Sequence, residues 1–190
     1  MSPQLKEYAD HYRESQTEAH RVADGLTDEQ FNWKPSQKEW SVGECIVHLN
    51  TIAKAYLPEF EGAIEAGLPD GQGPYTYGLL ARLFTNAVRP GSRPLPTGGP
   101  MNPSKGGTVS EVDKARAMAS FDSYTGRYIT LCESLEGRNY ASVKIRSPFL
   151  AMLRLPLGAF VDAMGLHAIR HVQQAERVTQ RPGFPASRAL

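Results

Sequence analysis

Cysteine is scarce in this chain of 190 residues, which contains only Cys45 and Cys132. Two cysteines cannot make the disulfide framework of a small secreted domain, so a reducing compartment is the simpler expectation. No stretch approaches the ~18 apolar residues of a membrane-spanning helix. The first residues, MSPQLKEYADHYRESQ, have no apolar core of the kind that a signal peptide requires. We therefore expect a cytoplasmic protein with no membrane partner.

An excess of one charge is also missing. Lys and Arg number 21 against 20 Asp and Glu, and no strongly basic block occurs. Proteins that bind nucleic acid neutralise its phosphates with clustered Lys and Arg, so we expect no nucleic-acid partner. The length suits one core, which predicts a single domain over 1–190.

Four stretches carry apolar residues at three- and four-residue steps, the spacing of an amphipathic helix. The first extends from Leu5 to Leu26. The second begins at an S-x-x-E capping box formed by Ser41 and Glu44, and Gly67 ends it. These features predict the first two long helices.

The third and fourth helices are predicted in the second half of the chain. Thr108 and Glu111 form another S/T-x-x-E pattern, from which a helix is expected to extend to about Leu135. Pro156 stands near the first turn of the fourth helix, where its missing N–H costs nothing, and this helix is expected to end near Thr179.

Residues 67–107, between the second and third helices, hold 9 of the 17 glycines and 7 of the 14 prolines. Such a segment cannot be regular structure, apart from one short helix expected within 76–84. In the connection between the third and fourth helices, an extended stretch is expected at 141–145. Four helices with one long crossover predict an all-α four-helix bundle. The crossover is either a lid over a site or an ordinary surface connection. As a lid it would offer Tyr75, Tyr77, Arg82 and Arg89.

The stretch GLHAIRHVQQ places His167 and His171 four residues apart in the fourth predicted helix. At 3.6 residues per turn, both rings project from one face, so one helix can offer two imidazoles to one cation. Both histidines fall on or beside the apolar stripe, where a buried imidazole needs a partner. The plainer alternative is a pair of boundary histidines bonded to neighbours or water, and the H-x-x-x-H spacing alone favours it.

A third histidine reverses this preference. His48 lies inside the second predicted helix, between Cys45 and Ile52 on the core-facing side. Two histidines from one bundle helix and one from another can converge on a cation. Three protein ligands leave a coordination position open, which is typical of catalytic metal sites. A satisfied core histidine is the alternative for His48 taken alone.

Two segments together resemble the DinB-like family. LTDEQFNWKPSQKEWSVGECIVHL (26–49) is similar to the entry of that family's second helix, with its W-S-x-x-E-x-x-x-H pattern. HAIRHVQQAERV (167–178), followed by GFP (183–185), is similar to its final helix and tail. The resemblance covers both histidine-bearing helices with matching spacing over most of the chain.

The resemblance implies an up-down-down-up four-helix bundle that holds a divalent metal ion through His48, His167 and His171. The metal would be zinc, nickel or iron, and the partner a small-molecule substrate. Relatives include thiol S-transferases that use bacillithiol or glutathione-like cofactors, so a low-molecular-weight thiol is a further candidate cofactor. Bundles of this kind commonly pair, which makes a homodimer a further expectation.

One residue departs from the family pattern. The first histidine of the final pair is often followed by an acidic residue, whereas here Ala168 follows His167. Chemistry that relied on this carboxylate is therefore in doubt. Candidate supporting residues are Glu44, which the capping box already explains, Gln174, which could contact a metal-bound water, and Arg170, for which an acidic neighbour is expected.

Other polar residues are weaker candidates. Cys45 is interpreted as a buried, inert thiol that, with Trp40, occupies the positions of a hydrophobic staple. Asp162 could orient an imidazole, although its spacing to His167 is poor. His11 and His20 follow no pattern and are interpreted as surface residues.

Three functional hypotheses follow. The first is a metal-dependent thiol S-transferase or hydrolase, in which the cation generates a nucleophile at neutral pH without a separate base. The second is a non-catalytic metal-binding or stress-response protein. The third is a helical interaction module whose histidines never meet.

Overall fold

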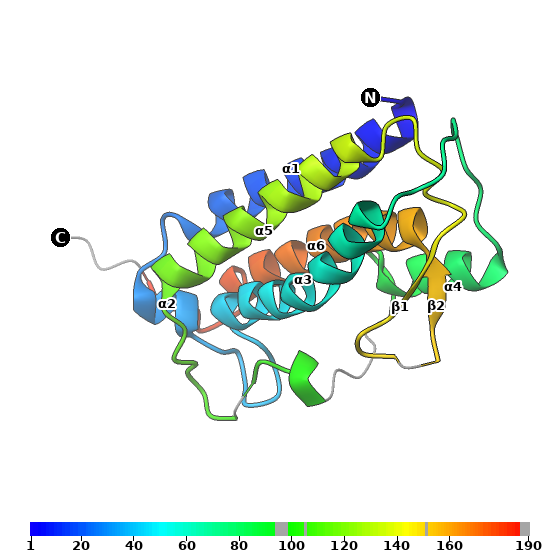
Figure 1. Ribbon diagram of the computed structural model, residues 1–190. Coiled ribbons are helices and arrows are strands. Elements are labelled where there is room, and N and C mark those ends of the chain that lie inside the picture. Colours follow the sequence, from blue (N-terminus) through cyan, green and yellow to red (C-terminus); the bar gives the residue numbers. More distant parts are fainter. Residues whose placement is uncertain (94–98, 105, 151, 187–190) are drawn as a thin grey trace.

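Four long helices pack side by side in the computed structural model, which describes residues 1–93, 99–104, 106–150 and 152–186 (Figure 1). Their bounds are α1 Pro3–Ala23, α3 Val42–Glu65, α5 Lys114–Ser134 and α6 Leu157–Thr179. The predicted all-α bundle is confirmed. None of the described helices is long and apolar enough to cross a membrane.

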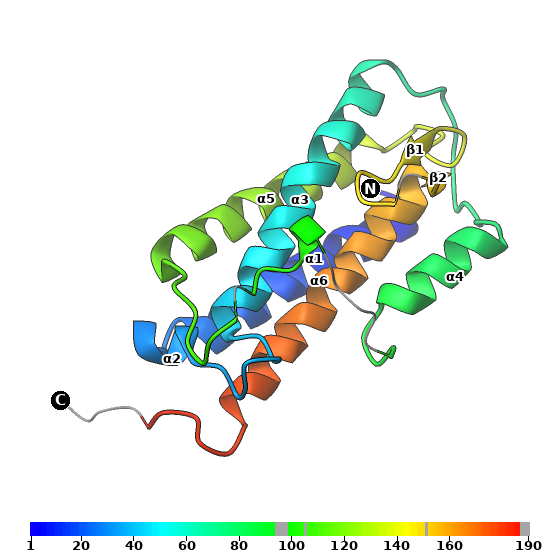
Figure 2. The same ribbon diagram turned by 90° about the horizontal axis from the view of Figure 1, so that it is seen from below.

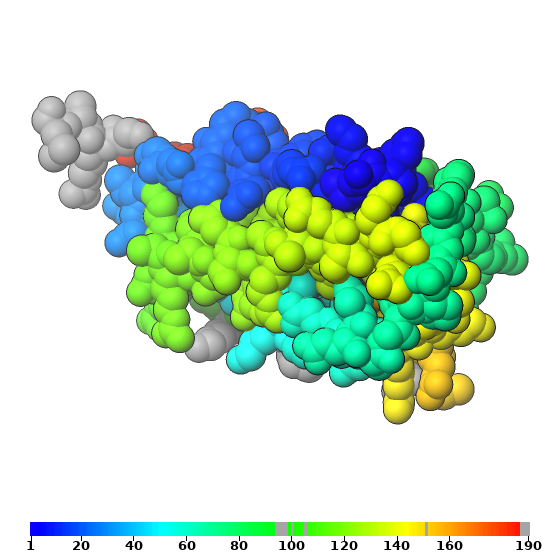
Figure 3. Space-filling view, turned by 45° about the horizontal axis from the view of Figure 1, so that its top comes forward, coloured from blue at the N-terminus to red at the C-terminus, as the bar shows by residue number. Residues whose placement is uncertain are grey.

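The directions of the four helices confirm the up-down-down-up order. α1 and α6 run one way and α3 and α5 the other, and each of α1 and α3 packs against both α5 and α6 (Figures 1 and 2). Figure 3 shows α1, in blue, lying along α5 on one face of the molecule. Because α3 and α5 are parallel neighbours, the chain between them must return along the bundle, which a short turn cannot do.

The shorter elements lie in the connections. Beyond the long helices, the described elements are α2 Asp28–Asn32, α4 Leu79–Val88, the 3-10 helix η1 Gly99–Met101, β1 Lys144–Arg146 and β2 Arg154–Pro156. α4 confirms the short helix expected within the crossover. β1 falls in the stretch expected to be extended and pairs antiparallel with β2. α2 was not predicted, and residues 94–98 and 105 of the crossover lie outside the described residues.

The capping box of α3 is confirmed, whereas the one expected for the third long helix is wrong. Ser41 Oγ accepts a hydrogen bond from the Glu44 N–H at 2.9 Å, and the Glu44 carboxylate accepts one from the Ser41 N–H at 3.0 Å. α5 instead begins at Lys114, capped by Asp113. The residues before it are extended because Asn32 binds them: its carbonyl accepts the Ser110 N–H at 2.8 Å.

The apolar core forms two clusters, one toward each end of the bundle. One contains Leu5, Phe60 and Phe160, and the other contains Val22, Ile46 and Val172. His48 and His167 occur where the clusters meet, since Met164 belongs to the first and Ala168 to the second. Both cysteines are buried and free. The histidines therefore lie at the middle of the bundle, bordered by apolar packing on both sides.

A buried ion pair ties the start of α3 to the segment before it. Lys34 Nζ lies 3.2 Å from Glu44 Oε1, and the two side chains are 0% and 3% exposed. Lys34 also donates to Ser104 Oγ at 2.6 Å, so the crossover is joined to the same pair. Removing one member of a buried pair leaves the other charge unpaired, which costs far more than losing a surface pair.

We expect Glu44→Ala to lower the free energy of unfolding by about 3 kcal/mol or more, since it removes a helix cap and leaves Lys34 unpaired. Urea denaturation measures the change. The matched control is Glu61→Ala, which removes the partly exposed pair with Arg127 and should cost at most about 1 kcal/mol. Equal losses in the two variants would contradict this assignment.

Candidate metal centre

Three imidazoles converge between α3 and α6. His48 comes from α3, and His167 and His171 come from successive turns of α6. One ligand atom from each ring lies within 4.8 Å of the other two. The structure therefore brings together the three histidines that the sequence singled out.

The spacing of the ring nitrogens fits a shared cation. Nε2 of His48 and Nε2 of His167 are 3.1 Å apart. Two nitrogens that each lie ~2.05 Å from one ion are separated by ~3.3 Å in a tetrahedral site and by ~2.9 Å at right angles in an octahedral one. The observed separation lies between these values, so the two nitrogens are spaced to share one cation. Without a cation, the same distance is that of a hydrogen bond between the two rings.

A backbone carbonyl fixes the proton on His48. His48 Nδ1 lies 2.7 Å from the carbonyl oxygen of Met101, at the end of η1. A carbonyl oxygen can only accept, so Nδ1 carries the hydrogen and Nε2 of the neutral ring has a free lone pair. Metal-binding histidines are commonly oriented in this way through their second nitrogen. Figure 2 shows η1 lying over α3, where this contact forms.

Burial holds all three rings in the neutral form that metal binding requires. It lowers the pKa of His48. The pKa of His167 falls to about 3, first through burial and then through the nearby His48 and Arg170. The pKa of His171 is also lowered well below its usual value by burial, with smaller contributions from His167, His48 and Arg170. Protonation therefore does not compete with a cation near neutral pH.

The surroundings of the cluster include two ring nitrogens without partners in the described part of the chain, and the indole of Trp40. Nδ1 of His167 and Nδ1 of His171 are buried without a hydrogen-bond partner among the described residues. The indole of Trp40 lies over the other side of the cluster, with ring centroids 4.9 Å from His48 and 5.6 Å from His171. The Met101 carbonyl gives His48 a partner for its second nitrogen, whereas Nδ1 of His167 has none among the described residues.

A cavity of about 500 Å³ opens directly on His167 and His171. The crossover supplies Val88 and Asn102 to its wall, and Trp40 and Gln174 also line it. The crossover thus covers the site. The residues expected from it as contacts, Tyr75, Tyr77, Arg82 and Arg89, are not in the lining. Tyr77 instead bonds to Tyr8, with 3.1 Å between the hydroxyl oxygens.

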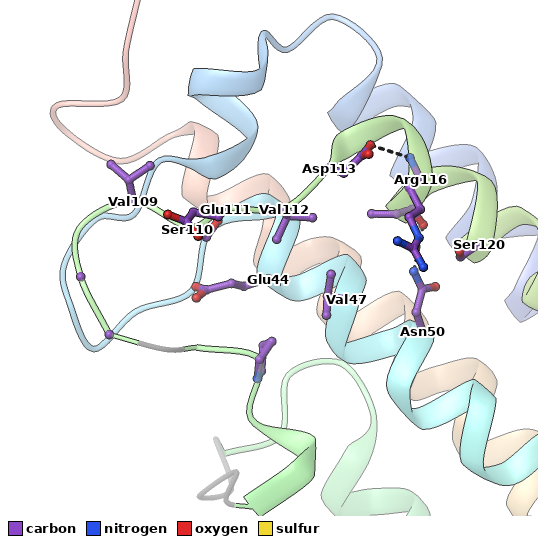
Figure 4. A pocket seen from close by; sticks show the side chains of 14 residues that line it. Glu44, Val47, Asn50, Val109, Ser110, Glu111, Val112, Asp113, Arg116 and Ser120 are labelled. Atoms are coloured by element: carbon purple, nitrogen blue, oxygen red, sulfur yellow. Dashed lines mark hydrogen bonds between the residues drawn. The ribbon is translucent and has the colours of Figure 1, made fainter.

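Of the three candidate supporting residues, Gln174 and Arg170 line the cavity beside the cluster. Hydrogen bonding of Gln174 with His171 opposes the fall in the pKa of that ring. Glu44 lies on the α5 side of α3, in the wall of a different cavity of about 630 Å³ (Figure 4). Its role is the helix cap and the Lys34 pair, which leaves it outside the histidine cluster.

The expectation of an acidic neighbour for Arg170 is wrong. Its guanidinium donates to the carbonyl oxygens of Ala87, at 2.9 Å, and Arg93, at 3.2 Å, and to Ser92 Oγ. Ala87 lies in the last turn of α4, where carbonyls lack partners within the helix, and Ser92 and Arg93 follow that helix. Arg170 thus fastens the crossover to α6, and its charge has no carboxylate beside it.

The remaining polar candidates lie elsewhere. Asp162 is 3.6 Å from His11 Nδ1 and has no contact with His167. His11 is half-buried, which corrects its interpretation as a surface residue, because α1 packs closely on Gly165 of α6. His20 is partly exposed between Asp24 and Asp122. The Cys45 thiol is fully buried, and burial raises its pKa, as expected for an inert thiol.

Two groups at the centre were not predicted from the sequence. The Met101 carbonyl has no sequence signature, because every residue carries one. Trp40 was interpreted as part of a hydrophobic staple, yet its ring packs on His48 and His171. The tryptophan of the W-S-x-x-E-x-x-x-H pattern was the available signal.

Comparison with known proteins finds a matching family and a similar fold. A family model described as the DinB superfamily matches residues 11–175. The solved structure of YfiT from Bacillus subtilis, described as a probable metal-dependent hydrolase with an unusual four-helix bundle topology, has a TM-score of 0.63. At 14% identity, the match covers 97% of this chain and 91% of YfiT, and it shows a shared fold. No curated protein matches the chain.

The neutral histidines predict a specific loss of stability in acid. Unfolding returns His167 to a pKa of about 6.5, so below this pH the unfolded chain binds more protons and stability falls. Between about pH 7.5 and about pH 5, the free energy of unfolding of the metal-free wild type should fall by about 2 kcal/mol more than that of the His167→Gln variant. Urea denaturation at both pH values measures this difference.

His20 provides the control of opposite sign. Its pKa is raised by hydrogen bonds to Asp122 and Asp24, so it stabilises the fold in acid and this stabilisation is lost as the pH rises. His20→Gln should therefore make the acid loss steeper. An identical pH dependence in the wild type and His167→Gln would contradict the assignment of a neutral, buried His167.

Proposed function

The chain belongs to the DinB superfamily, and from this membership and the three-histidine cluster we propose that it is a metal-dependent enzyme, a hydrolase or a thiol S-transferase. His48, His167 and His171 are the proposed ligands of one divalent cation. Three neutral imidazoles suit zinc, nickel and iron alike, because affinity order does not select among them.

The observation that carries this proposal is the cavity beside the ligands. A structural zinc site is closed by four protein ligands, whereas a catalytic site keeps a position for water or substrate. Here two of the three proposed ligands, His167 and His171, line a space of about 500 Å³, large enough for a small molecule. A non-catalytic metal-binding protein would not need this space, so the cavity favours an enzyme.

The residues around the histidines favour activation of a nucleophile without a separate base. Ala168 follows His167, and Glu39 is the only carboxylate among the described residues that line the cavity. Glu39 pairs with Arg181 at 3.0 Å and is therefore engaged. When bound, a divalent cation supplies Lewis acidity, which makes water or a thiol nucleophilic at neutral pH.

Three groups of the chain orient, shield or extend the proposed site. The Met101 carbonyl keeps the proton of His48 on Nδ1, so that Nε2 faces inward. Trp40 shields one side of the cluster from water, and Gln174 offers an amide to a reactant in the cavity. A small-molecule substrate, a cytoplasmic location and a homodimer remain predictions, the last testable by light scattering.

We expect the protein purified without a histidine tag to carry about one equivalent of metal. His171→Ala should lose at least about nine-tenths of it, because two imidazoles no longer form the three-ligand site. Elemental analysis by mass spectrometry measures the content. His20→Ala, which removes a histidine outside the cluster, should retain the metal. Absence of metal in every preparation would remove the basis of the proposal.

Turnover distinguishes the enzyme from a metal-binding protein. The metal-loaded protein should act on a panel of esters and amides, or join bacillithiol, mycothiol or glutathione to an electrophile. His48→Ala should lower kcat/KM by a factor on the order of 10³, since the ligand set is lost. His11→Ala is the control. Inactivity across both panels with metal bound would favour the non-catalytic alternative.

A further inference from the structure

Cationic side chains surround the cavity beside the histidines. Its lining contains Lys38, Arg170, Arg177 and Arg181, against the single carboxylate of Glu39. The whole chain has a formal net charge of only +1 at pH 7, so a generally basic protein does not account for this concentration. These cationic groups give the cavity a positive potential before any cation binds, which favours the entry of an anion.

Most of this charge is not neutralised within the protein. Arg181 pairs with Glu39 at 3.0 Å. Arg170 donates only to neutral oxygens of the crossover. Neither Lys38 nor Arg177 pairs with a carboxylate in the described part of the chain. Two exposed cationic side chains are thus available to a ligand, and the fixed charge of Arg170 lies beside them.

The positions of these residues follow one row of α6. Arg170, Gln174 and Arg177 recur at steps of four and three residues, which places them on the same helix face, and Arg181 continues the row just beyond the helix end. The same face carries His167 and His171. Because Lys38 comes from the segment before α3, the cationic groups approach the cavity from two sides.

The cavity of about 630 Å³ beside α5 has the opposite character. Glu44, Glu111 and Asp113 line it together with Arg116 (Figure 4). The contrast shows that an excess of cationic side chains is not shared by both of these cavities. It also supplies Arg116 as a matched control residue.

We propose that this cavity binds a small molecule with an anionic group, a carboxylate or a phosphate, which Arg177 and Lys38 hold while the rest of the molecule reaches the histidines. The assignment rests on the proposed function for the direction in which the molecule lies. Anion binding itself needs only the cationic side chains. A guanidinium offers paired donors to either anion, and the lysine ammonium adds a point charge.

The size of the cavity limits the ligand. A volume of about 500 Å³ accommodates a metabolite-sized molecule and excludes a folded partner. Three neutral histidines around a divalent cation would leave its charge uncompensated, and Arg170 adds to that charge. A negatively charged substrate therefore gains from both the centre and the rim, whereas its neutral analogue gains from neither.

The test measures binding to the metal-free protein, so it does not depend on turnover. Trp33→Phe leaves Trp40 as the sole tryptophan, and its ring lies on His48 and His171, so its fluorescence reports on the cavity. Succinate, inorganic phosphate and the neutral succinamide are titrated separately, with calorimetry as a second measurement. We expect saturable binding of an anion with a Kd on the order of 1 mM or tighter, and none of succinamide.

The variants decide which residues act. Arg177→Gln combined with Lys38→Gln should raise the Kd at least about tenfold, whereas Arg116→Gln should leave it unchanged. Binding of succinate alone indicates a carboxylate, and binding of phosphate alone a phosphate ester. No anion binding by either measurement, or equal binding of succinamide, would overturn the inference.

The two proposals can fail separately. If the histidines bind zinc but no anion binds, with or without zinc, the anionic substrate class is wrong and the metal centre stands. If an anion binds through Arg177 and Lys38 while no metal is ever found, the proposed function fails and the anion site stands. Each result therefore addresses one proposal at a time.

Discussion

Desolvation of three imidazoles is the constraint on which this structure depends. A protonated ring cannot be buried cheaply beside two others, so the cluster is stable only when all three are neutral. The lowered pKa values of His48, His167 and His171 express this cost. The same neutrality exposes lone pairs to one another, which favours a shared cation. Placement between two apolar clusters thus raises the cost of protonating the rings and leaves their lone pairs available to a cation.

The direction of the helices brings the crossover to this cluster. Because α3 and α5 are parallel, the connection must return along the bundle, and on its way it passes the histidines. Met101 there fixes the proton of His48, and Arg170 holds the segment after α4 against α6. The Gly- and Pro-rich composition that prevents regular structure lets the crossover follow this path. The helix topology therefore determines which part of the chain lies beside the histidines.

Sequence reasoning succeeded where a property is local. Periodicity located the four long helices, and the i, i+4 spacing placed His167 and His171 on one face, because both depend only on helix geometry. It failed where a distant partner competes. The pattern at Thr108 did not cap a helix, since Asn32 binds the residues that follow it. Arg170 was expected to meet a carboxylate, but it donates to carbonyl oxygens at the end of α4, because α4 packs against α6.

By itself, the sequence determined a four-helix bundle with three core-facing histidines and a long irregular crossover. Only the tertiary structure decided that Nε2 of His48 lies 3.1 Å from Nε2 of His167, and that a backbone carbonyl holds the proton of His48. It also gathered Lys38 with the arginines of α6 around one cavity. Spacing within a helix follows from 3.6 residues per turn, whereas distances between helices follow from the packing of the whole chain.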